Sequence, residues 1–284
     1  MVNTAVRAAR EAGKIILSYL GRLDSHDISS KGQRDFVTRA DQEAEAAILD
    51  IVCSAYPEHG VIAEESGEKA GGEYTWVIDP LDGTTNFIHG YPHFAVSIAV
   101  LRNGQPEHGV IFDPHRGDLF CASRGDGAQL NDRRIRTSRH KRLNEALLVT
   151  GFPIRRSDLI DPWMRTFRAL LPQAGGIRRS GSAALDLAYV AAGRFDGFWE
   201  FGLHPWDMAA GALLVREAGG LIADLDGGQN FLSTGNVVSA NPYIFNDQNM
   251  LWRAGVGVSI WVCAFVIPFV CITMHHLSEP TLAS

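Results

Sequence analysis

One acidic turn constrains this chain of 284 residues more than any other part of its sequence. The apolar run 76–78 predicts a strand that carries Asp79 at its end. Pro80 fixes one backbone angle and Gly83 permits a tight one, so a sharp turn is expected to bring Asp79 and Asp82 together. Two neighbouring carboxylates repel each other unless a cation lies between them, and hard oxygen ligands select Mg²⁺. The alternative interpretation is an acidic surface turn, because so short a pattern also occurs by chance.

Groups before and after this turn extend the pattern. Residues 83–85 offer backbone N–H groups and hydroxyls of the kind that hold a phosphate. Glu64 follows the predicted strand 61–63, and Asp207 begins the predicted helix 206–218. Taken alone, Glu64 is typical of a solvated strand end, and Asp207 of an acid at a helix N-terminus. Only their joint occurrence points to a site that binds a metal and a phosphate.

The overall composition is that of a globular protein. Hydrophobic residues make up 46% and charged residues 20%, and the length suits one large domain or two smaller ones. The formal net charge of −6 argues against broad, sequence-independent binding to nucleic acid. The four cysteines form no CxxC pair, so they indicate neither a zinc site nor a redox motif. They are typical of reduced thiols in a cytoplasmic protein.

Hydrophobic periodicity predicts a mixture of helices and strands. Thr38 and Asp41 have the spacing of a capping box at the start of the second helix, and Gly219 with Gly220 ends the last one. The predicted helices are 2–20, a segment after Thr38 that Pro57 closes, 183–192 and 206–218. The predicted strands are 61–63, 74–78, 95–101, 110–112, 119–122, 147–150, 176–179, 195–201, 221–223 and 237–240. This mixture predicts layers of helices and sheets, although the pattern alone does not give their order.

Four separated motifs, taken together, resemble the inositol monophosphatase family, and within it the bacterial SuhB-type branch. In chain order they are Lys31-Gly-x-x-Asp35-Phe-Val-Thr38-x-x-Asp41, Glu64-Glu65-Ser66, Asp79-Pro-Leu-Asp82-Gly-Thr-Thr-Asn-Phe and Trp206-Asp207. The resemblance implies an α/β (α+β) fold, the layered α-β-α-β-α sandwich of the inositol monophosphatase and fructose-1,6-bisphosphatase type. It also implies a catalytic domain at 1–248, with a metal-binding N-terminal half of about 1–140 and a C-terminal half of about 141–248.

The resemblance assigns roles to individual residues, together with two to three Mg²⁺ ions in each active site. The implied metal ligands are Glu64, Asp79, the carbonyl of Leu81, Asp82 and Asp207. The implied catalytic residues are Glu64, Thr84 and Asp41, the last two as a hydrogen-bonded pair that orients the attacking water. The implied substrate contacts are Glu64, Leu81, Asp82, Gly83, Thr84, Arg178, Gly181, Ser182, Ala183, Glu200 and Asp207.

The activity that the resemblance implies is Mg²⁺-dependent hydrolysis of myo-inositol 1-phosphate, or of a related small phosphomonoester, by an activated water. The nearest alternative activities are those of fructose-1,6-bisphosphatase and bisphosphate nucleotidase. The sequence at residues 84–87, and Trp206-Asp207 with Glu200 before it, resembles the inositol branch better than either of these enzymes. A different class is an assembly factor, because SuhB-type members are linked to transcription antitermination. The resemblance further implies a cytoplasmic homodimer that lithium inhibits.

The residues after 248 depart from the family pattern. The stretch 254–274 has 21 residues without a formal charge, which reaches the length of a membrane span. Pro268 lies within it, and membrane helices tolerate proline better than soluble ones do. The tail 249–284 is therefore a membrane anchor, a hydrophobic segment packed on the body or a partner, or the product of a reading-frame change. The abrupt break without a linker favours the reading-frame change.

A basic strip occupies residues 133–142, with Arg133, Arg134, Arg136, Arg139, Lys141 and Arg142. Most such strips are solvated loops. The alternative is a surface that binds a partner or RNA.

Overall fold

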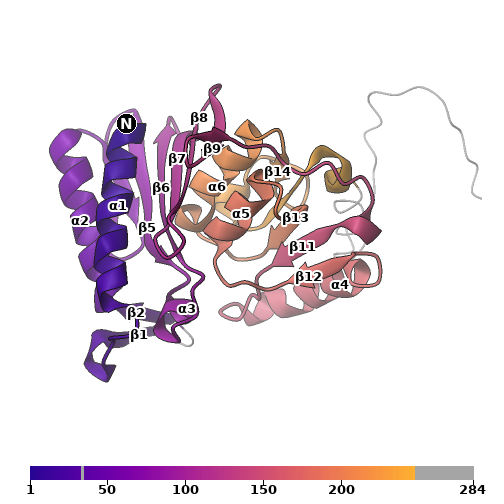
Figure 1. The fold of residues 1–284 in the computed structure, drawn as a ribbon, viewed down its shortest axis with the longest axis horizontal. Coiled ribbons are helices and arrows are strands. Elements are labelled where there is room, and N and C mark those ends of the chain that lie inside the picture. The colour runs from indigo at the N-terminus through magenta and orange to yellow at the C-terminus, as the bar shows by residue number, and fades with distance from the viewer. Residues whose placement is uncertain (33–34, 247–284) are drawn as a thin grey trace, which may run out of the picture.

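The computed structural model describes residues 1–32 and 35–246. Helices and sheets alternate along its longest dimension, in the order helix pair, large sheet, helix pair, small sheet, helix (Figure 1). The α-β-α-β-α layering that the family resemblance implies is thus confirmed. The predicted tail 249–284 lies outside the described residues.

Two N-terminal helices cover one face of the large sheet. α1 (Val2–Tyr19) and α2 (Arg39–Ala55) pack against Trp76 and Ile78, while Val77 faces the other side, because strand residues alternate between faces. The strand order is β10-β9-β8-β7-β6-β5-β3-β4; β3 pairs with β5 in parallel and the other neighbours are antiparallel. The bounds are β3 Gly60–Ala63, β4 Gly67–Lys69, β5 Tyr74–Asp82, β6 Ala95–Arg102, β7 Gln105–Asp113, β8 Asp118–Ser123, β9 Gly127–Leu130 and β10 Arg133–Arg134.

A second helix pair separates this sheet from a smaller one. α5 (Ala183–Ala191) and α6 (Pro205–Glu217) share one core with Phe120 of the large sheet and Phe198 of the small sheet. The small sheet has the order β12-β11-β13-β15-β14. Its bounds are β11 Leu147–Thr150, β12 Gly176–Arg178, β13 Gly197–Glu200, β14 Leu221–Ala223 and β15 Val237–Ala240.

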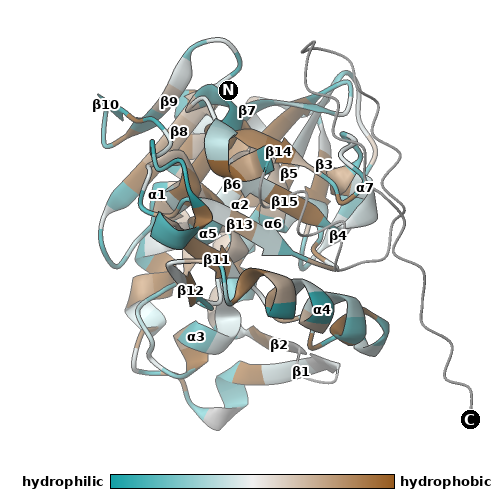
Figure 2. Ribbon diagram, turned by 90° about the vertical axis from the view of Figure 1, so that its right-hand side faces the viewer, coloured by the Kyte–Doolittle hydropathy of each residue, from teal (hydrophilic) through white to brown (hydrophobic). Residues whose placement is uncertain are grey.

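The outermost layer is α4 (Ile160–Leu170), which the sequence analysis did not predict. Its buried Trp163 and Leu170 pack on the small sheet, and polar and apolar bands alternate along it (Figure 2). The other unpredicted elements are short. They include the hairpin of β1 (Ile28–Gly32) and β2 (Asp35–Thr38), the helices α3 (Thr84–Ile88) and α7 (Phe231–Thr234), and the 3-10 turns η1 (Ser25–Asp27), η2 (Leu143–Glu145) and η3 (Ser157–Leu159).

The end of β5 differs from the prediction, which stops this strand at residue 78. β5 continues to Asp82. Asp79 lies opposite Ser97 and Asp82 opposite Ala95, so three steps along β5 match two along β6, and one extra residue forms a β-bulge. Residues three apart in a regular strand point to opposite faces. The bulge therefore brings Asp79 and Asp82 to the same face, which the sequence analysis had attributed to a tight turn.

Within residues 1–32 and 35–246, no helix is both long enough and apolar enough to cross a membrane.

The two central helices cross where Gly211 of α6 meets Leu187 of α5. A Cβ atom at Gly211 would lie 2.5 Å from the Cβ of Leu187, which forces the helices apart. Alanine in place of a helix-interior glycine normally stabilises by about 1 kcal/mol. Here we expect Gly211→Ala to lower the free energy of unfolding by about 1–3 kcal/mol instead, measured by urea denaturation.

Gly72→Ala is the matched control, since the nearest atom to its new Cβ would be 3.8 Å away. We expect its stability to stay within about 0.5 kcal/mol of the parent. A urea midpoint for Gly211→Ala at or above that of the parent would contradict the tight crossing.

Candidate metal and phosphate site

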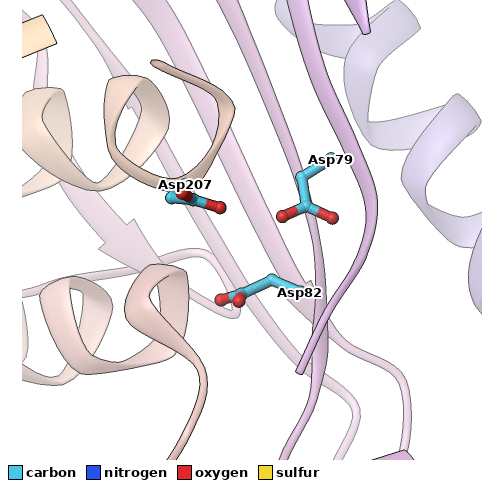
Figure 3. A group of neighbouring side chains, drawn as sticks. All are labelled: Asp79, Asp82 and Asp207. Carbon is cyan, nitrogen blue, oxygen red and sulfur yellow. The ribbon is translucent and has the colours of Figure 1, made fainter. Parts of the chain in front are cut away.

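Three aspartates from two distant parts of the chain converge. Asp79 and Asp82 come from β5 and Asp207 from α6, and Figure 3 shows their carboxylates pointing toward one another. One oxygen from each lies within 4.8 Å of the others. Asp79 is buried and the other two are half-buried. These are three of the metal ligands that the sequence analysis expected.

Asp207 is held at the start of α6 by local contacts. Pro205 opens the helix, and the carboxylate of Asp207 accepts a hydrogen bond of 2.7 Å from the backbone N–H of His204. The hydroxyl of Ser97 on β6 donates to the carbonyl of Trp206 over 3.1 Å. This bond fixes the start of α6 against the large sheet, beside the bulge that carries the other two acids.

Glu64 reaches the same cavity from the end of β3. Its backbone N–H donates to the carbonyl of Ile78 over 3.2 Å. The loop after it is held by Glu45 of α2, whose carboxylate accepts the N–H groups of Glu65 at 2.8 Å and Ser66 at 2.7 Å. The sequence analysis did not identify Glu45. The available signal in the sequence was an acid four positions after Asp41, on the same face of the predicted helix. The loop that Glu45 holds lies about 20 residues away, so the local pattern does not reveal its partner.

Asp82 is the point where the second half of the chain reaches the first. Its Oδ2 accepts hydrogen bonds from the hydroxyl of Ser182 at 2.6 Å and from the backbone N–H of Ala184 at 2.7 Å. Both donors belong to the N-terminus of α5, where Ser182 is the N-cap. Asp82 thus lies between its neighbouring acids and a positively polarised helix end.

Thr84 and Asp41 form the pair that the sequence analysis expected. The hydroxyl of Thr84 lies 3.1 Å from Oδ1 of Asp41 and 3.1 Å from the carbonyl of Leu81. The capping box of α2 is also confirmed, because the backbone N–H of Thr38 donates to Asp41 over 2.9 Å. Burial raises the pKa of Asp41 to about 6. Gly83 between these groups has a φ of 96°, the left-handed conformation that glycine adopts without strain.

The acids destabilise one another's charged forms. Burial raises the pKa of Asp79 well above its usual range, and the charges of Glu64 and Asp82 raise it further. Burial likewise raises the pKa of Asp207, with the charge of Asp82 adding to the effect. The pKa of Asp82 rises to about 6 through burial, although the hydrogen bond from Ser182 lowers it. A bound divalent cation would relieve this repulsion, and the all-oxygen donor set is the one that Mg²⁺ prefers.

A cavity of about 190 Å³ lies above the acids. Its walls include ten of the eleven expected substrate contacts. These are Glu64, Leu81, Asp82, Gly83, Thr84, Gly181, Ser182, Ala183, Glu200 and Asp207.

Arg178, the remaining expected contact, does not line this cavity. It is exposed, and its Nη1 donates to the carbonyl of Ile177 over 3.1 Å. The next residue, Arg179, lines the cavity, as do Arg155 and Arg156, none of which the sequence analysis singled out. Successive side chains of a strand point to opposite faces of the sheet. The sequence could therefore show which of Arg178 and Arg179 faces the cavity only if the end of the strand were known.

Asn86 ties the two walls of the cavity together. Its side-chain N–H₂ group donates to the carbonyls of His93 at 2.8 Å and Ser180 at 3.0 Å. It thereby fixes the loop before α5 to the turn after Gly83. The sequence analysis included Asn86 in its motif without giving it a role.

The model of the inositol monophosphatase family matches residues 1–253. The chain belongs to the inositol monophosphatase family. Among curated family members, it is 54% identical to the Nus factor SuhB of Pseudomonas aeruginosa, over 86% of this chain and 93% of the relative. Among solved family structures, it superposes on an extragenic suppressor protein SuhB from Bartonella henselae with a TM-score of 0.86 and 43% identity, over 89% of this chain and 98% of the other. An inositol monophosphatase from Anabaena gives a TM-score of 0.80 and 41% identity, over 89% and 95%.

The acid cluster predicts how the stability of the metal-free protein depends on pH. In the unfolded chain aspartates titrate near 3.9, whereas burial raises the pKa of Asp82 to about 6 and those of Asp79 and Asp207 well above their usual range. The folded state then binds more protons than the unfolded state from about pH 4 upward, so the free energy of unfolding falls as pH rises through this window. In EDTA we expect a higher urea midpoint at pH 5 than at pH 7.5.

Two comparisons isolate the cause. Asp82→Asn removes one titrating group from the cluster, so it is expected to reduce the difference between the two pH values. Mg²⁺ at pH 7.5 is expected to raise the midpoint of the parent, because a ligand that binds only the folded state stabilises it. If the urea midpoint instead rose from pH 5 to pH 7.5, by the same amount in the parent and in Asp82→Asn, the electrostatic interpretation would be contradicted.

Proposed function

We propose that this chain is a Mg²⁺-dependent phosphatase that hydrolyses myo-inositol 1-phosphate or a related small phosphomonoester. The observation that carries the proposal is the convergence of Asp79, Asp82 and Asp207 beside the Gly83-Thr84 turn, in the wall of one cavity. Glu64 adds a fourth carboxylate to the same cavity. Acids that repel one another, next to a phosphate-holding turn, are what a metal-assisted phosphatase requires.

The donor set divides naturally between two cations. Glu64, Asp79 and the carbonyl of Leu81 would hold the first, and Asp79, Asp82 and Asp207 the second. When bound, Mg²⁺ supplies positive charge that stabilises the transferring phosphoryl group and makes water a better nucleophile. Ser182 and the N-terminus of α5 keep the Asp82 carboxylate oriented for this task.

The protein groups around the cavity can position and deprotonate a water molecule. The Thr84 hydroxyl donates to Asp41, which leaves its oxygen able to accept a hydrogen bond from water. As that water loses its proton, Thr84 can pass its own proton to the buried Asp41, and Glu64 offers a second acceptor on the cavity wall. Water then attacks phosphorus directly, which agrees with the lack of a recognisable nucleophilic Cys or Ser motif in the sequence.

The remaining walls would hold the substrate. The backbone N–H groups of Gly83 and Thr84 suit the phosphate oxygens. Residues 181–183 and Glu200 lie on the other side of the cavity, where they can donate to and accept from hydroxyl groups of a polyol.

The activity is tested with the full-length chain and myo-inositol 1-phosphate. We expect phosphate release that requires Mg²⁺, with kcat/KM lowered about 100-fold or more by Asp82→Asn, the order of effect expected for the loss of a charge-stabilising group. Asp132→Asn, an exposed residue far from the acids in sequence, is the control and is expected to retain activity. Absence of release from a folded, Mg²⁺-binding protein would contradict the substrate assignment.

A second candidate function is an assembly factor in transcription, alongside catalysis. It is supported by the likeness to the Nus factor SuhB and by the basic strip 133–142. The strip is anchored on its inner side, where the side chain of Asn241 donates to the hydroxyl of Ser138 at 2.8 Å and to the carbonyl of His140 at 3.1 Å. All six of its Lys and Arg side chains stay exposed, and such a fixed cationic surface suits a polyanionic or acidic partner.

Charge reversal tests this role. We expect the triple substitution Arg133→Glu, Arg136→Glu and Arg139→Glu to abolish co-purification with RNA polymerase complexes while phosphatase activity stays. Asp82→Asn should instead lose phosphatase activity and still co-purify with RNA polymerase complexes. The control reverses three exposed charges on α1, Arg7, Arg10 and Lys14, which changes the net charge equally. Equal loss of co-purification in both triple variants would contradict a specific role for the strip.

A further inference from the structure

A buried histidine lies behind the wall of the cavity, in the segment between α3 and β6. Only 5% of the surface of His93 is exposed, and its ring packs edge to face on Tyr189 of α5, with the ring centres 5.9 Å apart. Its Nε2 atom is buried, and no atom of residues 1–32 or 35–246 forms a hydrogen bond with it. Because an unpaired buried polar atom lowers stability, this ring is expected to serve a purpose beyond packing.

The carboxylate that faces this ring belongs to Asp186 of α5. Nε2 of His93 lies 3.9 Å from Oδ1 of Asp186, and Asp186 is itself only 1% exposed. Burial raises the pKa of Asp186, whereas the nearby His93 and Ser180 lower it. A hydrogen bond needs a separation of about 3 Å, so a shift of about 1 Å would join the two side chains. Removal of the imidazole would leave the buried Asp186 with one compensating group fewer.

Asp186 holds the loop that forms one wall of the cavity. Its carboxylate accepts a hydrogen bond from the hydroxyl of Ser180, and its backbone N–H donates to the carbonyl of Ser182 over 3.0 Å. The hydroxyl of Ser182 in turn donates to the carboxylate of Asp82 over 2.6 Å. A continuous chain of contacts therefore runs from His93 through Asp186 to a predicted metal ligand.

The segment that carries this histidine is itself fixed. The carbonyl of His93 accepts a hydrogen bond from the side chain of Asn86 over 2.8 Å, and the carbonyl of Pro92 accepts one from Arg116 over 2.8 Å. A Cβ atom at Gly83 would lie 3.0 Å from the His93 carbonyl oxygen, so the turn after β5 packs closely against this segment. The imidazole is thus a fixed point against which the neighbouring carboxylate can be held.

We propose that His93 is a positioning residue: through Asp186 it holds the loop 180–182, and with it the hydroxyl that orients Asp82 toward a bound cation. This inference rests on the proposed binding of Mg²⁺ at the acid cluster. Without the imidazole, the buried Asp186 carboxylate would turn toward other donors and draw Ser180 with it, because a buried charge is costly without a partner. Groups that orient a metal ligand from behind commonly alter metal affinity.

The test measures Mg²⁺ binding to the full-length chain by titration calorimetry. His93→Phe keeps an aromatic ring and removes the N–H group, and we expect it to raise the Kd for Mg²⁺ about 3–10-fold, less than the loss of a group that touches a ligand directly. Loss of a positive charge would instead strengthen cation binding, so a weaker affinity is attributable to position. His115→Phe, the same change at an exposed histidine, is the matched control and should keep the parent Kd.

A double variant separates positioning from packing. Asp186→Asn in the His93→Phe background removes the buried charge, while the amide oxygen can still accept a hydrogen bond from Ser180. We expect this double variant to bind Mg²⁺ more tightly than His93→Phe alone, because replacing both partners is nearly neutral whereas removing one is not. A ring that only fills space would show no such rescue.

Ser180→Ala interrupts the same chain of contacts by a small change at a half-buried residue. It should also raise the Kd for Mg²⁺, and the addition of His93→Phe should raise it little further, because both changes act through Asp186. This variant supplies the test on its own if His93→Phe does not fold, which circular dichroism of each variant checks.

The possible failures are distinguishable. An unchanged or lower Kd in His93→Phe or in Ser180→Ala, or a double variant that binds no better than His93→Phe, overturns the positioning role while the phosphatase function stands. If the parent binds no Mg²⁺, the proposed function and the positioning role both fail. If the parent binds Mg²⁺ but releases no phosphate from myo-inositol 1-phosphate, the activity alone fails, and the comparison of Kd values still decides the role of His93.

Discussion

The hydrogen bonds that Asp82 accepts from Ser182 and Ala184 join the two halves of the chain at the point where charge is most concentrated. Without them, Asp82 would add one more uncompensated carboxylate to Asp79 and Asp207. The N-terminus of α5 offsets part of that repulsion and fixes the distance between the walls of the cavity.

Much of the fold could be predicted from local pattern. The helices α1, α2, α5 and α6 follow apolar periodicity, and most strands of the two sheets follow short apolar runs between turn residues. The short edge strands β4, β9 and β10 were not predicted, because β4 and β10 are polar and β9 is too short to show a pattern. The hairpin of β1 and β2 could not be predicted in this way, because the segment 28–32 is polar and shows no alternation. The order of the layers also came from the family resemblance, since the periodicity of a helix does not reveal which sheet it covers.

The site was predictable to the extent that its groups are close in sequence. Asp79, Asp82 and the Thr84 pair lie in one motif, and their convergence is confirmed, although a bulge rather than a turn produces it. Glu45 holds a loop about 20 residues further along the chain, and Arg179 lines the cavity beside residues from other elements, so no local pattern predicts either role. Arg178, which the family resemblance implies as a substrate contact, is exposed and outside the cavity, whereas the next residue, Arg179, lines it.

The sequence distance between Asp82 and Ser182 has a consequence for how the molecule forms. These residues are 100 positions apart, so the loop that their contact closes carries a large entropic cost during folding. Proteins dominated by contacts between distant residues fold more slowly than those rich in local contacts. A nascent chain that has emerged only as far as β12 has the sequence for the whole large sheet but lacks Asp207, so its acid cluster is incomplete. The three-aspartate site is therefore complete only once α5 and α6 have docked on the large sheet.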